Sequence, residues 1–196
     1  MNVKKKILLL AGGPSKERKI SLATGKAVYE ALKTLGYDII KIDPNAALTD
    51  FLKYNCDLAF NALHGQFGED GIIQKFLEQQ KIRYTHSGAK SSAIAMDKLK
   101  SKRKFIKIKI KTPKFKVIKK LQDLNNSISK KKFVIKPINE GSSVGVLIYS
   151  NFDQINKSLI KKYLKKYNQL LQEEFVEGKE VQAAVMGSKA IGAIEI

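Results

Sequence analysis

The residues of this chain whose types and spacing point most directly to chemistry lie in FVIKPINEGSSVGVLIYS, residues 133–150. Two apolar runs flank the loop GSSVG (141–145), and Lys136 stands at the end of the first run. Glycines let such a loop pack closely against a ligand, and its successive backbone N–H groups can form an anion site. The pattern favours a hairpin tip that closes over phosphate beside Lys136, although it also fits an ordinary Gly/Ser turn.

The same loop matches G-x-S-x-G, the pattern of a serine hydrolase, with Ser143 at the nucleophile position. That chemistry requires a helix after the serine and a histidine later in the chain. Here an apolar run (145–150) follows, and both histidines, His64 and His86, precede the loop. The hydrolase interpretation fails on this context.

A second candidate segment is AGGPSKERKISL (11–22), a Gly-rich turn that opens a helix and so favours an anion at its free N–H groups. It has neither the Rossmann pattern nor a P-loop, which predicts a small carboxylate rather than a pyrophosphate. Glu17 within the turn suits an ammonium group, so an amino-acid zwitterion satisfies both features. The alternative is that Glu17 only complements the helix dipole.

The third candidate is ALHGQFGEDG (62–71), which follows a predicted strand. His64 stands just past the end of that strand, where ligands of open parallel sheets bind. A loop histidine with purely structural contacts fits equally well.

The elements that must position these segments alternate between strands and helices through the first 95 residues. We expect strands at 6–10, 37–43, 57–63 and 82–85, and helices ending at Gly36 and spanning 47–54 and 72–80. Ser21 is the expected N-cap of the first helix, and the expected buried face holds Leu22, Ala23, Ala27, Val28, Ala31, Leu32 and Leu35. This alternation predicts an α/β domain with a parallel, doubly wound sheet over residues 1–95.

The second half of the chain, residues 96–196, has a different rhythm. Helices are expected at 92–106 and 153–164, and short strands at 114–118, 131–138, 145–150, 169–176, 180–186 and 189–196. Short strands in succession predict an antiparallel α+β unit. The last strand runs to Ile196 without a turn or polar tail, so we expect the natural protein to continue beyond it.

The net charge of +19 is carried mostly by lysine, since only three of the 37 basic residues are arginines. Residues 98–120 hold twelve Lys or Arg and no acid. A lysine-rich nucleic-acid-binding protein is one interpretation; the other, which the scarcity of arginine favours, is an ordinary solvated surface without specific nucleic-acid binding. One cysteine, Cys56, and no apolar run long enough to span a membrane predict a cytoplasmic protein without membrane contact.

Five segments in order along the chain resemble the D-alanine–D-alanine ligases of the ATP-grasp family. They are AGGPSKERKISL, ALHGQFGEDG, MDKLKSK (96–102), VIKPINEGSSVGV (134–146) and QEEFVEGKE (172–180). The resemblance implies a pre-ATP-grasp, Rossmann-like substrate domain at 1–95. It further implies an ATP-grasp central domain with the start of a C-terminal domain at 96–196.

The resemblance implies roles on the D-alanine side of the site. Glu17 would orient the first D-alanine through its ammonium group and join a hydrogen-bond network with Ser142, which makes these two the catalytic candidates. His64 would lie near the same D-alanine.

It implies roles on the ATP side as well. Lys98 and Lys136 would bind the phosphates, covered by the loop that carries Ser142 and Ser143. Adenine would be held by Glu173 and the backbone of Phe175 and Val176, and the ribose hydroxyls by Glu180. Glu174 departs from relatives that have lysine there, which leaves that contact open.

The implied reaction phosphorylates the carboxylate of D-alanine to an acyl phosphate, which the amine of a second D-alanine attacks to give a dipeptide for peptidoglycan. ATP with Mg²⁺ or Mn²⁺ is the implied cofactor set, with no metal ligand in this chain and the ligands expected beyond Ile196. The resemblance also implies a homodimer. Ligases that accept D-lactate or D-serine as second substrate remain open alternatives.

We therefore expect the purified 196-residue chain alone to be inactive, because phosphoryl transfer without its metal ligands is very slow. The measurement is release of ADP and dipeptide from ATP and D-alanine. Turnover by this chain alone would contradict the expectation.

Overall fold

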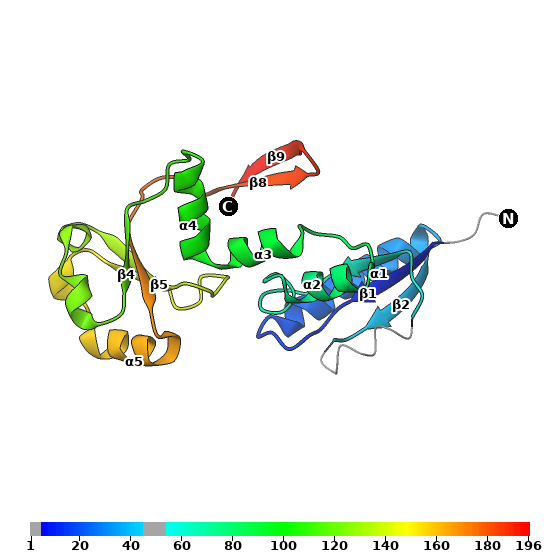
Figure 1. The fold of residues 1–196 in the computed structure, drawn as a ribbon, viewed down its shortest axis with the longest axis horizontal. Coiled ribbons are helices and arrows are strands. Elements are labelled where there is room, and N and C mark those ends of the chain that lie inside the picture. Colours follow the sequence, from blue (N-terminus) through cyan, green and yellow to red (C-terminus); the bar gives the residue numbers. More distant parts are fainter. Residues whose placement is uncertain (1–4, 45–53) are drawn as a thin grey trace. The chain divides into compact units, whose positions relative to one another are not determined.

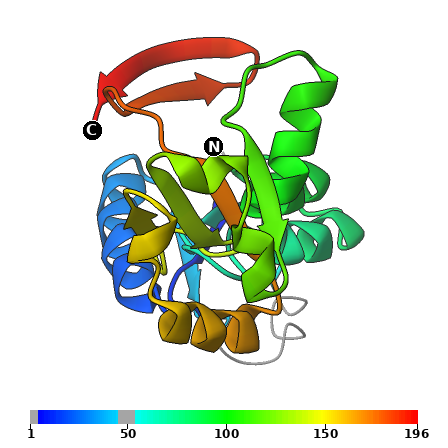
Figure 2. The ribbon, with the colours of Figure 1, turned by 90° about the vertical axis from the view of Figure 1, so that its left-hand side faces the viewer.

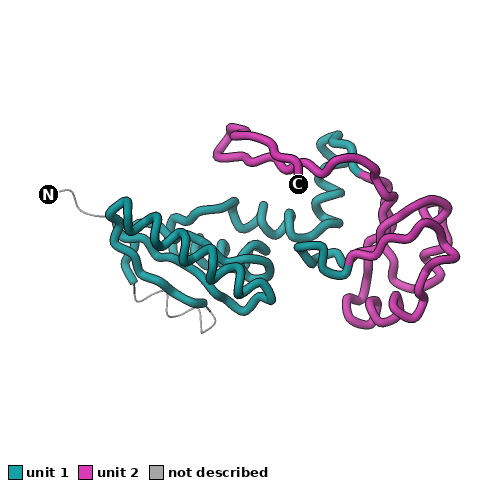
Figure 3. The backbone as a smooth tube through the Cα atoms, turned by 180° about the vertical axis from the view of Figure 1, so that it is seen from behind, with its two compact units in different colours: residues 1–112, 137–145 teal, residues 113–136, 146–196 magenta. Residues whose placement is uncertain are grey.

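A computed structural model describes residues 5–44 and 54–196, which fall into two compact units (Figure 3). The first unit comprises residues up to Thr112 together with Pro137–Gly145, and the second comprises Pro113–Lys136 and Val146–Ile196. The domain boundary that we place at residue 95 stays a prediction. The helix predicted at 47–54 lies outside the described residues, apart from its last position.

The first unit contains the parallel sheet that the sequence predicts. Strand β1 (Lys6–Leu10) lies between β2 (Asp38–Ile42) and β3 (Leu58–Asn61), and both neighbours run parallel to it. The strand expected at 82–85 is reduced to one parallel bridge between Ala59 and Tyr84. All three strands end at the same edge, which brings the loops after β1 and β3 together.

Two helices cover opposite faces of this sheet (Figures 1 and 2). On one face α2 (Ile72–Gln79) contributes Ile73 and Leu77 to a buried cluster with Leu8 and Leu10 of β1. Helix α1 (Arg18–Thr34) lies against the other face. Coverage on both faces explains why KILLL is apolar at nearly every position.

The prediction that Ser21 caps α1 is wrong, since the helix begins at Arg18 and Ser21 lies fully buried one turn inside it. The predicted buried face is also displaced, because Leu22 and Leu35 are 45% and 72% exposed. The face that packs inward carries Ser21 and Gly25. A Cβ at Gly25 would lie 2.4 Å from the Ala11 Cβ, so the helix approaches the sheet too closely there for a larger side chain.

The single helix expected at 92–106 is broken into α3 (Ala89–Met96) and α4 (Lys98–Lys107). Asp97 is the residue between them, in extended conformation, and its carboxylate accepts a hydrogen bond from Lys100 N–H at 2.9 Å. An aspartate N-cap both ends the first helix and starts the second.

The second unit is built on an antiparallel sheet, which confirms its α+β character. The strand order is β4 (Phe115–Ile118), β7 (Leu170–Glu174), β5 (Phe133–Pro137), β6 (Leu147–Tyr149). Helix α5 (Lys157–Tyr167) begins later than predicted because Asn156 caps it, and the short helices η2, η3 and η4 span Leu121–Leu124, Ser127–Lys130 and Phe152–Gln154. The core gathers Phe133, Ile135 and Ile160.

A hairpin of β8 (Val181–Met186) and β9 (Lys189–Glu195) completes the chain. Every residue of both strands is exposed, including Val185 and Ile194 at 66% and 67%. A two-stranded hairpin exposed on both faces has little stability of its own.

Glu78, at the end of α2, links α2 to the following segment within the first unit. Its carboxylate accepts hydrogen bonds from the Tyr84 hydroxyl at 2.6 Å and from the N–H of Ala89, the first residue of α3, at 3.0 Å. The Ala89 and Tyr84 bonds lower the pKa of Glu78. Burial, followed by the bond to Glu78, raises the pKa of Tyr84 to about 12.

Replacing Tyr84 by Phe should make the free energy of unfolding less dependent on alkaline pH. The folded-state pKa of Tyr84 lies above its ordinary value of 10.0, so its contribution is complete below pH 10 and is lost as the pH rises toward about 12. Urea unfolding at several pH values, with tyrosinate absorbance to follow ionisation, measures the effect. Tyr37→Phe, at a residue 38% exposed, is the matched control. A free energy of unfolding that falls with alkaline pH as steeply in Tyr84→Phe as in the wild-type chain would contradict the assignment; Tyr149, whose pKa burial also raises, is unchanged in both.

Candidate functional site

The loops that follow β1 and β3 are joined by the buried hydroxyl of Ser21. Its Oγ accepts a hydrogen bond from Gly12 N–H at 2.8 Å and donates one to the Ala62 carbonyl at 2.8 Å. Gly12 begins the turn after β1, and Ala62 begins the loop that carries His64. One side chain therefore sets the distance between two of the three predicted site segments.

The ion pair of Arg18 and Asp43 holds the same turn from the side of β2. The Asp43 Oδ1 accepts from Gly13 N–H at 2.9 Å and from Arg18 Nη1 at 2.8 Å, and Arg18 also donates to the Gly13 carbonyl at 3.1 Å. The hydrogen bond to Asp43 raises the pKa of Arg18. A Cβ at Gly12, where φ is +99°, would lie 2.6 Å from Asp43 Oδ1, which explains the glycine.

These contacts narrow the prediction that the turn presents free N–H groups to an anion, because four of those groups are already paired. The N–H groups of Gly12 and Gly13 donate to Ser21 and Asp43, and those of Glu17 and Arg18 donate to the side chain and carbonyl of Ser15. The donors stabilise the turn itself. What the turn offers a ligand is the carboxylate of Glu17.

Glu17 lies between the GSSVG loop and the β3 loop. Its Oε1 accepts a hydrogen bond from Ser142 Oγ at 2.7 Å, the contact that the family resemblance implies. A Cβ at Gly65 would lie 2.2 Å from its Oε2, so the glycine leaves room for the carboxylate. The role of Glu17 and Ser142 toward a substrate stays a prediction.

The GSSVG loop lies between β5 and β6, which pair antiparallel as a hairpin. Its tip is left-handed at Ser142 (φ 47°), Ser143 (φ 57°) and Gly145 (φ 73°). The predicted hairpin tip is thus present, with two serines in a conformation that is uncommon for residues other than glycine.

Lys98, the predicted phosphate ligand of the first unit, contacts the segment that leads into this loop. Its N–H donates to the Ile138 carbonyl at 3.1 Å, and its ammonium donates to the Glu140 carbonyl. The Glu140 carboxylate in turn lies 3.6 Å from the ammonium of Lys16. Lys98, Ser142 and Glu17 therefore belong to one connected group.

His64 contacts Thr24 Oγ1 through Nε2 at 3.0 Å, and its Nδ1 lies 3.6 Å from the Glu69 carboxylate. Sequence reasoning gave no role to His86, which has φ 92° and whose Nδ1 lies 3.3 Å from the amide nitrogen of buried Asn61. Desolvation, only partly offset by Glu69, lowers the pKa of His86. The signal that could have pointed to His86 is its partner Asn61, a polar residue at the carboxyl end of the apolar strand β3.

The second unit brings together Lys136 and Glu173, both assigned to ATP from sequence. The Lys136 ammonium lies 2.7 Å from Glu173 Oε2, and their side chains are only 22% and 8% exposed. Both come from neighbouring strands, β5 and β7, with side chains on the same side of the sheet. A half-buried cation beside an acceptor can hold a phosphate oxygen and an amino group.

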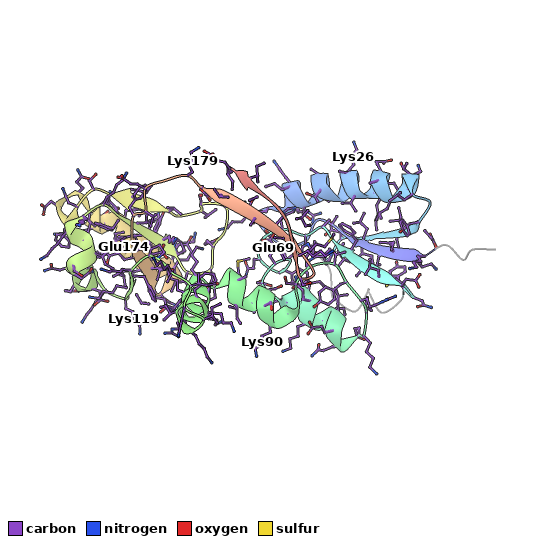
Figure 4. All side chains as sticks on the ribbon, turned by 90° about the horizontal axis from the view of Figure 1, so that it is seen from above. Lys26, Glu69, Lys90, Lys119, Glu174 and Lys179 are labelled. Atoms are coloured by element: carbon purple, nitrogen blue, oxygen red, sulfur yellow. The ribbon has the colours of Figure 1, made fainter. Side chains whose placement is uncertain are left out.

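Glu174, labelled in Figure 4, contacts the backbone of Lys114 through its carboxylate. Its Oε1 accepts from Lys114 N–H at 3.0 Å, and its own N–H donates to the Lys114 carbonyl at 3.0 Å. The Phe175 N–H donates to the Lys132 carbonyl at 3.1 Å. Val176, 65% exposed, is the remaining predicted adenine contact, and Glu180 lies exposed before β8.

A hollow of about 510 Å³ in the second unit is lined by Asn126, Ser129, Asn151 and Phe152, among others. Three of its polar side chains are already paired. Asn126 and Asn151 cap the short helices η3 and η4, and Ser129 donates to the Leu124 carbonyl. We assign this hollow no ligand.

Within residues 5–44 and 54–196, no group of three or more His, Cys, Asp or Glu side chains gathers as a metal site would require. In the same part of the chain no helix is both long and apolar enough to cross a membrane.

Comparison with known families gives two matches. The family described as D-ala D-ala ligase N-terminus matches residues 43–87, and that described as D-ala D-ala ligase C-terminus matches residues 101–196. A D-alanine–D-alanine ligase of Pelagibacter ubique is 52% identical over 98% of this chain and 64% of its own length. One from Wolbachia pipientis is 45% identical over 97% of this chain and 61% of its own length.

The comparison with solved structures leads to the same family as the sequence matches. A D-alanine–D-alanine ligase from Bacillus anthracis superposes with a TM-score of 0.86 at 32% identity, over 97% of this chain and 64% of that chain. The same enzyme complexed with ATP gives a TM-score of 0.84 at 30% identity, over 97% and 65%. The chain spans a little under two thirds of the length of these relatives.

Ser21→Ala should lower the free energy of unfolding by about 1–3 kcal/mol, since it leaves the buried Gly12 N–H and Ala62 carbonyl without partners. Urea unfolding measures the loss. Ser158→Ala, at an exposed position of α5, should change the same quantity by less than about 0.5 kcal/mol. Equal stability of the two variants would show that the Ser21 bridge contributes nothing.

Proposed function

The chain belongs to the D-alanine–D-alanine ligase family, and we propose that it carries the residues of an ATP-dependent ligase that bind the first substrate and the nucleotide. This ligase joins two D-alanines into D-alanyl-D-alanine through an acyl phosphate. The proposal extends to an ATP-grasp fold for the second unit, a cytoplasmic location, a role in peptidoglycan synthesis, and a homodimer.

The observation that carries the proposal is the hydrogen bond of 2.7 Å between Ser142 and Glu17. It joins the loop proposed to cover phosphate to the carboxylate proposed to hold the ammonium group of D-alanine. Phosphorylation of an amino-acid carboxylate needs these two ligands within a few ångströms of each other. Both residues lie in the first compact unit, so this proximity is a property of that unit alone.

On the D-alanine side, Glu17 is proposed to accept from the substrate ammonium, since its Oε2 is not the oxygen that Ser142 uses. Ser142 holds the carboxylate in one orientation. Because the N–H groups of Gly12 and Gly13 are already paired, they contribute nothing to the substrate carboxylate. Lys98 provides a positive charge beside the segment that leads into the loop.

On the nucleotide side, Lys136 is proposed to bind a phosphate oxygen while it keeps its contact with Glu173. Glu173 then holds Lys136 in place, and its carboxylate is the acceptor that we propose for the amino group of adenine. Val176 is proposed to present its backbone to the base. The ribose contact of Glu180 follows from resemblance alone.

Magnesium or manganese belongs to the proposed reaction, in which it would neutralise phosphate charge. The described residues gather no carboxylate cluster that fits such an ion, so we assign the metal no step on this chain.

The lysine-rich surface does not favour nucleic-acid binding as the function. Within residues 98–120, Lys98 and Lys102 contact the Glu140 carbonyl and Thr112, and Lys100 pairs with Asp97 at 3.1 Å. Lys26 and Lys90 lie at opposite sides of the first unit (Figure 4). Lysines distributed in this way form a solvated surface and no single binding stripe.

The relatives are named for D-alanine, which favours D-alanine over D-lactate or D-serine as the second substrate.

The test is separate calorimetric titration of the chain with ATP and with D-alanine. Glu17→Gln should weaken D-alanine binding about tenfold or more, because it removes a charge-assisted hydrogen bond, and should leave ATP binding unchanged. Lys136→Met should weaken ATP binding by a similar factor, with Lys136→Arg retaining part of it. Glu30→Gln and Lys162→Met, at exposed positions of α1 and α5, are the matched controls. A wild-type chain that binds neither ligand contradicts the proposal.

A further inference from the structure

We propose that Lys16 and Glu140 are positioning residues that form a latch on the GSSVG loop. They act beside the contact of Glu17 with Ser142. Lys16 and Glu17, consecutive residues of the first turn, thereby hold Glu140, which immediately precedes the loop, and Ser142 within it. The inference rests on the proposed function only for the identity of the ligand under the loop.

The geometry of the latch consists of two contacts within the first unit. Lys16 Nζ lies 3.6 Å from Glu140 Oε1, and Glu17 Oε1 accepts from Ser142 Oγ at 2.7 Å. One contact alone leaves a loop free to turn about it, whereas two contacts determine its orientation. The latch therefore sets which face of the loop meets the turn.

Glu140 is the centre of this arrangement because both its backbone and its side chain are used. Its carbonyl accepts from the ammonium of Lys98, and its carboxylate faces Lys16. The Glu140 side chain is 26% exposed, so its charge is partly withdrawn from water, while Lys16 is 71% exposed. A shift of Glu140 would move the attachment point of Lys98 as well as the loop.

The conformation of the loop explains why two attachments are needed. Ser142 and Ser143 are both left-handed, with φ of 47° and 57°. L-residues leave this region readily unless surrounding contacts hold them there. The Val144 N–H donates to the Gly141 carbonyl at 2.9 Å, which closes the tip as a turn and gives an amide that reports on it.

The experiment is NMR-detected amide exchange at Val144 in the unliganded 196-residue chain. Lys16→Glu and Glu140→Lys should each speed exchange about two- to fivefold, the range for a partly exposed ion pair. The double variant Lys16→Glu with Glu140→Lys restores opposite charges and should return exchange toward the wild-type rate. Lys19→Glu, an exposed neighbour on α1 with the same charge change, should have no effect.

Added salt should reduce the difference between Lys16→Glu and wild type, because it screens an exposed pair. Each single variant should also weaken ATP binding by a similar factor, and the double variant should recover it. Additive effects in the double variant, or an equal effect of Lys19→Glu, would overturn the latch. If charge reversal restores protection while the wild-type chain binds no ATP, the latch stands and the proposed function fails.

Discussion

The arrangement of the first unit depends on one buried hydroxyl. Ser21 lies between the Gly12 N–H and the Ala62 carbonyl, where the parallel strands β1 and β3 both end. Only a close approach of helix and sheet makes this contact possible, and Gly25 permits it by leaving no side chain against Ala11. The turn that bears Glu17 and the loop that bears His64 are thereby held at a defined separation.

The same packing determines which hydrogen-bonding groups each segment presents at the candidate site. The N–H groups of Gly12, Gly13 and Glu17 are already paired, and the side chain that the turn places against the GSSVG loop is an acceptor, the Glu17 carboxylate. The opposing GSSVG loop contributes a hydroxyl donor from Ser142, and Lys98 contributes a cation. An acceptor beside a hydroxyl and an ammonium donor fits the amino-acid ligase that we propose. In that proposal Glu17 binds the ammonium group of a zwitterion, which is a different reason from the one that the glycines of the turn suggested.

The candidate residues of the second unit form an ion pair, Lys136 with Glu173, that is largely withdrawn from water. Lys136 and Glu173 neutralise each other on neighbouring strands, which lets two charges lie at the edge of an apolar core. Breaking such a pair leaves a poorly solvated charge, so the phosphate that we propose at Lys136 would share this ammonium group with Glu173 and would not displace Glu173. Glu174, the next residue, points its carboxylate to the backbone of Lys114 instead.

Sequence alone determined the parallel sheet, the antiparallel unit, the hairpin around GSSVG and the family, because periodicity and motif order are local properties. It failed where packing decides. The residue type of Ser21 indicates an N-cap, yet the close contact of Gly25 with Ala11 places Ser21 in the core. The sequence likewise indicates that the N–H groups of Gly12 and Gly13 are free, whereas Asp43, thirty positions after Gly13, accepts from the Gly13 N–H. The pairing of Lys16 with Glu140 is equally non-local. Such contacts join residues that no window of sequence contains together, and only the tertiary structure decides them.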